Sequence, residues 1–192
     1  ATTLDEKELL SAAPLQRVRF DPAHVRFDGA LWYRRDLHTF SEQDPRVTVI
    51  ARGPHLAAIR ERGLTLLIGE ERKVARVAAT SDPGEAGVQD SVIVTLKAHS
   101  LPAVADQLTP PFGPETSFVT AMNGVPWWYF ERLPGPWEGH RIRAVDPEGR
   151  IAAAIAPERV IGWVVYPACE VVEPGVVRHV EGNRFQLGEI DG

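Results

Sequence analysis

The chain has 192 residues, of which 44 % are apolar and 24 % are charged, and its net charge is −5 at neutral pH. This is the composition of a globular protein with one substantial domain, and the charge gives no electrostatic reason to expect nucleic acid or an anionic membrane as a partner. One cysteine, Cys169, excludes an internal disulfide and a multi-cysteine metal site. No apolar stretch reaches the about 20 residues of a membrane span, and the acidic start lacks the features of a signal peptide, so a cytoplasmic location is expected.

Residues 1–45 predict a short helix followed by a β-hairpin. Thr3 and Glu6 fit a capping box at the helix start. Asp28-Gly29 lies between β-rich flanks, which favours a hairpin with a type I′ turn. A polar connector at 41–45 then leads into a stretch with a different rhythm. We therefore expect two units, an unrelated N-terminal segment over residues 1–45 and a second unit over residues 46–192.

Strands alternate with helices in the second unit. Apolar runs at 47–51, 91–96 and 117–121 predict neighbouring parallel strands that are covered on both faces. The remaining expected elements are helices at 55–62 and 100–108, an antiparallel pair at 64–69 and 73–80, and later strands at 161–168, 175–182 and 184–189. The pattern predicts an α/β fold with a Rossmann-like parallel sheet and flanking helices.

The stretch "RVTVIARGPHLAAIRERGL" (46–64) raises the question of a phosphate loop. A buried strand, a turn with Arg52 and Gly53, and a helix together have the form of the second strand of a dinucleotide-binding sheet. Such a sheet carries G-x-G-x-x-G after its first strand, because glycines allow the backbone to approach the pyrophosphate. Residues 1–45 contain a single glycine, Gly29, and the motif occurs nowhere else. The sequence therefore predicts a partial domain that lacks the first strand and the glycine loop, with a sheet edge left open for the N-terminal hairpin.

Four segments from residue 46 onward resemble the N-terminal, NADP-binding domain of the ketopantoate reductase family (2-dehydropantoate 2-reductase). They are "VTVIARGPHLAAIRERGL", "DSVIVTLKAHSLPAV", "FVTAMNGVPWWYF" and "EPGVVRHVEGNRFQLGE", in the order of the family. The resemblance implies NADP as cofactor and a small 2-keto acid as substrate. It also implies reduction of the keto group of 2-dehydropantoate by NADPH, in the pathway to pantothenate.

The resemblance assigns three cofactor-binding residues. Arg52 matches the residue that meets the NADP 2′-phosphate, and its guanidinium suits a phosphate. Lys97 matches a lysine near the nicotinamide end, and Asn123 matches the asparagine of an Asn-Gly turn that contacts cofactor or substrate. The alternatives are a solvated arginine in a turn, a lysine at a strand end, and an Asn-Gly turn chosen for its backbone freedom. All three positions follow predicted parallel strands, where open α/β sheets bind ligands.

No catalytic residue is assigned in this chain. In the family, a C-terminal helical domain supplies the lysine that acts as general acid, and no residue here matches it. We therefore expect the chain alone to be inactive as an oxidoreductase. Two alternatives remain open: a non-enzymatic remnant or interaction module, and a nucleotide-binding subunit whose sheet is completed by a partner chain.

An aromatic run and four scattered histidines complete the candidate residues. Packing of a helix against the sheet is favoured for the aromatic run, and an apolar pocket or a partner surface is the alternative. The histidines lack metal-ligand spacing, so no metal site is expected. The aromatic run is Trp127, Trp128, Tyr129 and Phe130, and the histidines are His55, His99, His140 and His179.

Overall fold

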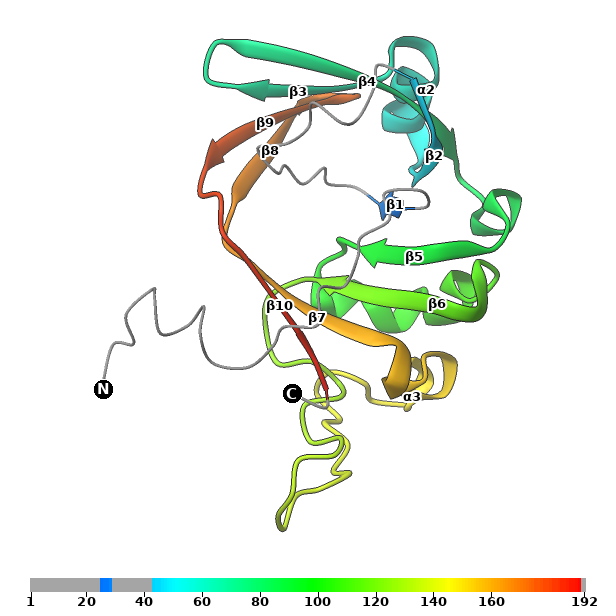
Figure 1. Cartoon of the computed structure of the whole chain (residues 1–192), viewed down its shortest axis with the longest axis vertical. Coiled ribbons are helices and arrows are strands. Elements are labelled where there is room, and N and C mark those ends of the chain that lie inside the picture. The colour runs from blue at the N-terminus through cyan, green and yellow to red at the C-terminus, as the bar shows by residue number, and fades with distance from the viewer. Residues whose placement is uncertain (1–24, 29–42, 191–192) are drawn as a thin grey trace.

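The computed structural model describes residues 25–28 and 43–190, with side chains from residue 47 onward. Within these ranges ten strands form one sheet, which Figure 1 shows strongly curled, in the order β10-β7-β6-β5-β1-β2-β4-β3-β9-β8. The strands are β1 (Val25–Asp28), β2 (Gln43–Ile50), β3 (Leu64–Ile68), β4 (Glu71–Thr80), β5 (Gln89–Val94), β6 (Phe112–Ala121), β7 (Val160–Val165), β8 (Ala168–Glu173), β9 (Val176–Glu181) and β10 (Phe185–Glu189).

The helical elements of the described chain are short. None of them is long and apolar enough to cross a membrane. The α-helices are α2 (Gly53–Arg62) and α3 (Arg150–Ala154), and the 3-10 helices are η2 (Pro83–Ala86), η3 (Ala98–Ala103), η4 (Ala105–Leu108) and η5 (Pro157–Arg159). The helix expected near the N-terminus and the second arm of the expected hairpin lie outside the described residues.

The middle of the sheet is a doubly wound parallel sheet. Its six strands β4-β2-β1-β5-β6-β7 are parallel at every pairing, and their order along the chain is the 3-2-1-4-5-6 order of dinucleotide-binding folds. The α/β, Rossmann-like prediction is therefore confirmed. The point where the strand order reverses lies between β1 and β5.

The expected open edge is wrong, and so is the expected absence of a first strand. Val25–Asp28 pairs in parallel with β2 on one side and with β5 on the other. A first strand in this order is central, so a gap there would leave backbone groups of two neighbours unpaired. The predicted pairing between the N-terminal segment and β2 is confirmed, but the pairing strand β1 lies in the middle of the sheet and not at its edge. The expected boundary at residue 45 falls within β2, which begins at Gln43, and the division into two units stays a prediction.

The remaining strands and helices follow the sequence in most places. The β5–β6 pair is parallel and the β3–β4 pair is antiparallel, as predicted. The prediction that β2 and β5 are neighbours is wrong, because β1 lies between them. Helix α2 ends at Arg62 and is capped by Gly63, where only glycine fits, because its φ is 81° and a Cβ there would lie 2.7 Å from the Ala75 carbonyl oxygen. The helix expected at 100–108 is two 3-10 helices, because Pro102 inside it has no N–H to donate.

A long bent hairpin joins the two ends of the curled sheet. Its first arm is β7 and β8, and its second arm is β9 and β10. One half pairs with β6 through β7, and the other half pairs with β3 through β9. The turn at Pro174-Gly175 lies beside the end of α2 and the start of β3, where the Gly175 carbonyl accepts from the Thr65 N–H at 2.8 Å. Residues from both halves of this hairpin line the candidate site described below.

Both faces of the parallel strands β5 and β6 are buried. One core cluster contains Val49, Ile93 and Val119, and a second contains Val92 and Phe118. Neighbouring residues of one strand thus enter different clusters, as the alternation of side chains along a strand requires. The expectation of strands covered on both faces is confirmed for the strands at 91–96 and 117–121.

Candidate functional site

The three residues predicted for the site all lie at one edge of the sheet. Arg52 follows β2, Lys97 follows β5 and Asn123 follows β6, and these strands run in the same direction. Their carboxyl ends therefore meet on the same side. All three residues are exposed; Arg52 and Asn123 line two different hollows, which are separated by η3.

Arg52 lines a hollow of about 740 Å³ between the start of α2 and the segment that follows β5. We call it the Arg52 hollow. Arg52 is the N-cap residue of α2 but makes no capping hydrogen bond with its side chain. Arg52 and the N-terminal end of α2 supply positive charge to the hollow, and none of the described lining residues is acidic. Its described lining is Ala51, Arg52, His55, Leu96, His99, Ser100, Ala103, Val104 and Val171.

His55 is a neighbour of Arg52 that sequence reasoning did not connect with the site. Its Nδ1 accepts a hydrogen bond from the Gly175 N–H at 3.0 Å, and burial lowers its pKa. The ring is thus neutral, with its proton on Nε2. This hydrogen bond connects the turn at Pro174-Gly175 to the first turn of α2. A sequence signal was present, because His55 follows Arg52 by three residues and helical neighbours at this spacing share a face.

Asn123 has a structural task that the sequence did not reveal. Its Nδ2 donates to the Val165 carbonyl oxygen at 2.8 Å, and its Oδ1 accepts from the Val165 N–H at 2.9 Å. The last backbone pairing between β6 and β7 is Ala121 with Trp163, two residues earlier on each strand. The amide therefore continues the ladder by one rung. One N–H and one lone pair of the amide remain for a ligand.

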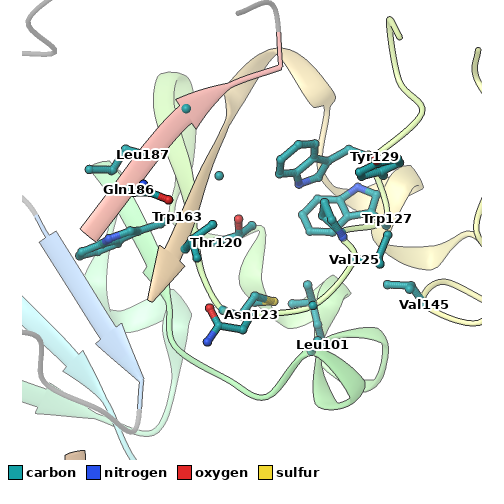
Figure 2. Close-up of a pocket in the computed structure, with 18 of the residues that line it drawn as sticks. Leu101, Thr120, Asn123, Val125, Trp127, Tyr129, Val145, Trp163, Gln186 and Leu187 are labelled. Atoms are coloured by element: carbon teal, nitrogen blue, oxygen red, sulfur yellow. The ribbon is translucent and has the colours of Figure 1, made fainter. Parts of the chain in front are cut away.

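A second hollow, of about 380 Å³, opens on the other side of η3. We call it the tryptophan pocket. In Figure 2, Trp163 and Leu187 lie on one side, Trp127 and Tyr129 lie opposite, and Asn123 lies below. Strands β6, β7 and β10 and the chain after β6 supply most of its lining, which comprises Ala98, Leu101, Thr120, Met122, Asn123, Gly124, Val125, Pro126, Trp127, Trp128, Tyr129, Val145, Gly162, Trp163, Val164, Gln186, Leu187, Gly188 and Glu189.

The aromatic run forms turns, so the helix favoured for it is wrong. Hydrogen bonds from the Tyr129 N–H to the Pro126 carbonyl and from the Glu131 N–H to the Trp128 carbonyl close successive turns. Pro126 is one of the residues that interrupt helical hydrogen bonding in this stretch. The alternative is observed, because three of the four aromatic residues line the tryptophan pocket.

Glycines on two strands shape the floor of this pocket. Gly162 on β7 faces Gly188 on β10 in register. A Cβ on Gly162 would lie 2.8 Å from Cη2 of Trp128, so the indole lies directly against the bare backbone of the strand. Sequence reasoning missed this contact, because strand register is not visible in a single sequence.

The two hollows lie on either side of η3, which contributes residues to both. Leu96, His99 and Ser100 face the Arg52 hollow, while Ala98 and Leu101 face the tryptophan pocket. Lys97 is the residue at the start of η3, between them. Over the described residues, no group of three or more His, Cys, Asp or Glu side chains is placed to hold a metal ion.

Comparison with known proteins identifies relatives of this chain. Residues 33–192 match the family model described as ketopantoate reductase PanE/ApbA. The 2-dehydropantoate 2-reductase of Mesorhizobium japonicum is 53 % identical over 146 residues, which are 76 % of this chain and 45 % of that protein.

Solved structures agree with this relationship. A ketopantoate reductase candidate from Ralstonia solanacearum MolK2 has 42 % identity and a TM-score of 0.75, over 87 % of this chain and 52 % of that one. A PanE/ApbA family ketopantoate reductase from Ralstonia eutropha JMP134 has 24 % identity and a TM-score of 0.63, over 85 % and 48 %, and shares the fold. The chain thus spans about half the length of the relatives that it matches.

Proposed function

The chain belongs to the ketopantoate reductase family, and from this premise we propose that its described residues form the NADP-binding side of a 2-keto acid reductase site. The activity of a whole reductase is part of the proposal, because the chain spans about half the length of its relatives. The Mesorhizobium relative gives 2-dehydropantoate as the reference substrate.

The Arg52 hollow is the observation that carries the proposal. An exposed guanidinium stands at the end of the second parallel strand, with His55, His99 and Ser100 around it and no acid in the described lining. Arg52 offers a planar fork of donors that matches a phosphate. NADP differs from NAD by its 2′-phosphate, so this hollow suits the adenosine end of NADP.

Lys97 and Asn123 suit the other end of the cofactor. They follow β5 and β6, on the far side of the reversal point from Arg52. The free N–H of Asn123 can donate to a carbonyl oxygen, and the ammonium of Lys97 can hold a carboxylate near the nicotinamide. Bound NADPH supplies the hydride. No described residue is assigned the proton donor, which the family resemblance gives to a lysine of a helical domain.

The residues present suit the two ends of NADP but not the pyrophosphate in the middle of the cofactor. A pyrophosphate is normally held by the amides of a glycine loop at a helix N-terminus. Gly29 is the one glycine of residues 1–45, so the sequence around β1 does not provide that motif. A single exposed charge pair contributes only ~0–1 kcal/mol. We therefore expect this chain alone to bind NADPH no more tightly than a dissociation constant of about 1 mM, near −4 kcal/mol.

Calorimetric titration with NADPH, NADH, adenosine 2′-monophosphate and adenosine 5′-monophosphate tests the proposal. R52A should weaken NADPH and the 2′-monophosphate several-fold and leave NADH and the 5′-monophosphate nearly unchanged. The matched control is R143A, which removes another exposed arginine that does not line the hollow. Equal losses for NADPH and NADH, or no difference between R52A and R143A, would contradict the role of Arg52.

A further inference from the structure

We propose that the tryptophan pocket receives the side chain of the keto acid and that this side chain is bulky and apolar. The inference deepens the proposed function and rests on it for the presence of a keto acid. It concerns a specificity that differs from that for 2-dehydropantoate, whose side chain ends in a hydroxyl group.

Carbon surface dominates the lining of the pocket. Aliphatic side chains lie on several sides of it in Figure 2, and indole rings form two of its walls. The aliphatic lining residues include Leu101, Val125, Val145, Val164 and Leu187, which come from separate segments of the chain. A volume of about 380 Å³ lies in the range of small-molecule sites and exceeds what a methyl group would fill.

The indole N–H groups do not make the pocket polar. The Nε1 atoms of Trp127, Trp128 and Trp163 are shielded from solvent and have no hydrogen-bond partner among the described residues. Trp127 packs edge-to-face against Phe118 and against Trp128, with interplanar angles of 71° and 82°. Because the nitrogens are covered, the rings present carbon to a ligand.

The polar groups in the lining already have protein partners. The Thr120 hydroxyl donates to the Ile161 carbonyl at 3.4 Å, and the Asn123 amide pairs with Val165. Oε1 of Gln186 accepts from the Tyr166 hydroxyl at 3.1 Å. The Asn123 amide, the Gln186 amide and the Thr120 oxygen keep some hydrogen-bonding capacity, so a substrate hydroxyl can pair only where it reaches one of the few polar groups; elsewhere in the carbon lining it stays unpaired, which costs free energy.

The position of the pocket fits the substrate better than the nicotinamide ring. In the proposed function the nicotinamide end lies over β5 and β6, and the tryptophan pocket lies one strand further, where β6, β7 and β10 meet. A hydride acceptor must lie next to that ring. The carboxamide of nicotinamide requires both donors and acceptors, and most of the pocket lining is carbon.

The charge of the lining sets the orientation of the keto acid. The described lining contains no cation and one carboxylate, that of the exposed Glu189. A substrate carboxylate inside the pocket would lose hydration without gaining a counterion. The carboxylate therefore stays at the mouth, towards Lys97 and Asn123, and the hydrocarbon end enters.

The test is an NMR titration of the ¹⁵N-labelled chain with keto acids in the absence of cofactor. The ligands are 2-dehydropantoate, 3,3-dimethyl-2-oxopentanoate, in which a methyl group replaces the hydroxyl group, and phenylpyruvate. The side-chain signals of Trp127, Trp128 and Trp163 should shift, whereas that of Trp137, which is 58 % exposed and does not line the pocket, should not. The ligand without the hydroxyl should bind about tenfold more tightly than 2-dehydropantoate, and phenylpyruvate more tightly still, by roughly fourfold for each further methylene equivalent buried.

A variant at the rim tests the cause of the preference. Val125 is 53 % exposed, so V125T adds a hydroxyl of similar shape at little risk to the fold. In V125T the advantage of the ligand without the hydroxyl over 2-dehydropantoate should fall several-fold. W137F is the control and should keep the advantage of the unmodified chain.

Three results would overturn the inference. They are equal or tighter binding of 2-dehydropantoate, a lack of shifts in the three pocket tryptophans with every keto acid, and shifts of these signals by nicotinamide mononucleotide at lower concentration than by any keto acid. None of these measurements involves Arg52 or the adenosine end. Failure of the substrate inference is therefore distinguishable from failure of NADP binding.

Discussion

Replacing Asn123 by alanine should loosen the end of the sheet at the candidate site. The side-chain amide forms two hydrogen bonds with the backbone of Val165, at 2.8 and 2.9 Å. Val165 is buried at 9 % exposure, so both of its backbone groups lose their partner at once in N123A. The rung that the amide adds after Ala121 and Trp163 is removed, and β7 is held by β6 over a shorter length.

The magnitude follows from the number of bonds. A typical hydrogen bond contributes about 0.5–1.5 kcal/mol net, and two of them about 1–3 kcal/mol. Asn123 is exposed, so water can replace part of the loss. We therefore expect the free energy of unfolding of N123A to fall by about 1–2 kcal/mol. For a chain of this size the corresponding drop in Tm is about 2–8 °C.

Urea unfolding followed by tryptophan fluorescence measures this change, with equal m-values as the sign that only stability has changed. N123D is the informative second variant, because the carboxylate still accepts from the Val165 N–H but faces the Val165 carbonyl without a donor. It should lose at least as much stability as N123A at neutral pH. If N123A is as stable as the unmodified chain and only its NADPH affinity falls, Asn123 contacts the ligand without supporting the sheet, and the reasoning is refuted.

Two further predictions concern groups beside the site. Burial lowers the pKa of His55 from its ordinary value of 6.5, so protons bind more readily to the unfolded chain. The stability that neutral His55 provides is therefore complete above pH 6.5 and is lost as the pH falls below it. In H55N the side-chain oxygen can still accept from the Gly175 N–H, so this variant should show a flatter loss of stability in urea unfolding between pH 7 and pH 5. G162A should displace Trp128 and lower the free energy of unfolding by about 1–3 kcal/mol. The control G188A adds its methyl group in open space and should change the free energy of unfolding little. Equal shifts in Tm for the two variants would mean that the position of Trp128 does not require a glycine at residue 162.

The sequence predicted the elements whose signals are local. The strand at 47–51 was visible from its apolar run, and α2 was visible from its length and from Gly63 at its end. The antiparallel pair β3–β4 was visible because its two arms are neighbours in the chain. These features depend on propensity, periodicity and turn chemistry over a few residues, which a single sequence contains.

The first strand was missed because its pairing is not local. Val25–Asp28 stands beside Gly29 and a second β-rich stretch, so a hairpin was the nearest partner in sequence. In the structure its partners are β2 and β5, and the pairing of Val25 with Ser91 joins residues far apart in the chain. The absence of a glycine loop does not imply the absence of a strand, because strand pairing depends on backbone hydrogen bonds and not on that motif.

The site was predicted in part for a similar reason. Arg52, Lys97 and Asn123 were found because they follow strands, and the structure brings them to one edge. The register of Gly162 with Gly188, and the partnership of Asn123 with Val165, depend on which strands are neighbours and at what offset. A single sequence does not contain this information, so the shape of the tryptophan pocket required coordinates.

In the proposed function, the two hollows favour one direction for a dinucleotide on the sheet. The Arg52 hollow has cationic and neutral groups, and the tryptophan pocket has carbon surface and Glu189. A 2′-phosphate carries a charge of about −1.5 to −2 at neutral pH. Placing it in the tryptophan pocket would bury that charge beside a carboxylate, whereas placing it at Arg52 pairs it with a guanidinium. The polarity of the sheet edge thus favours the adenosine end at β2 and the reactive end at β6, which leaves the apolar pocket free for the hydrocarbon part of the substrate.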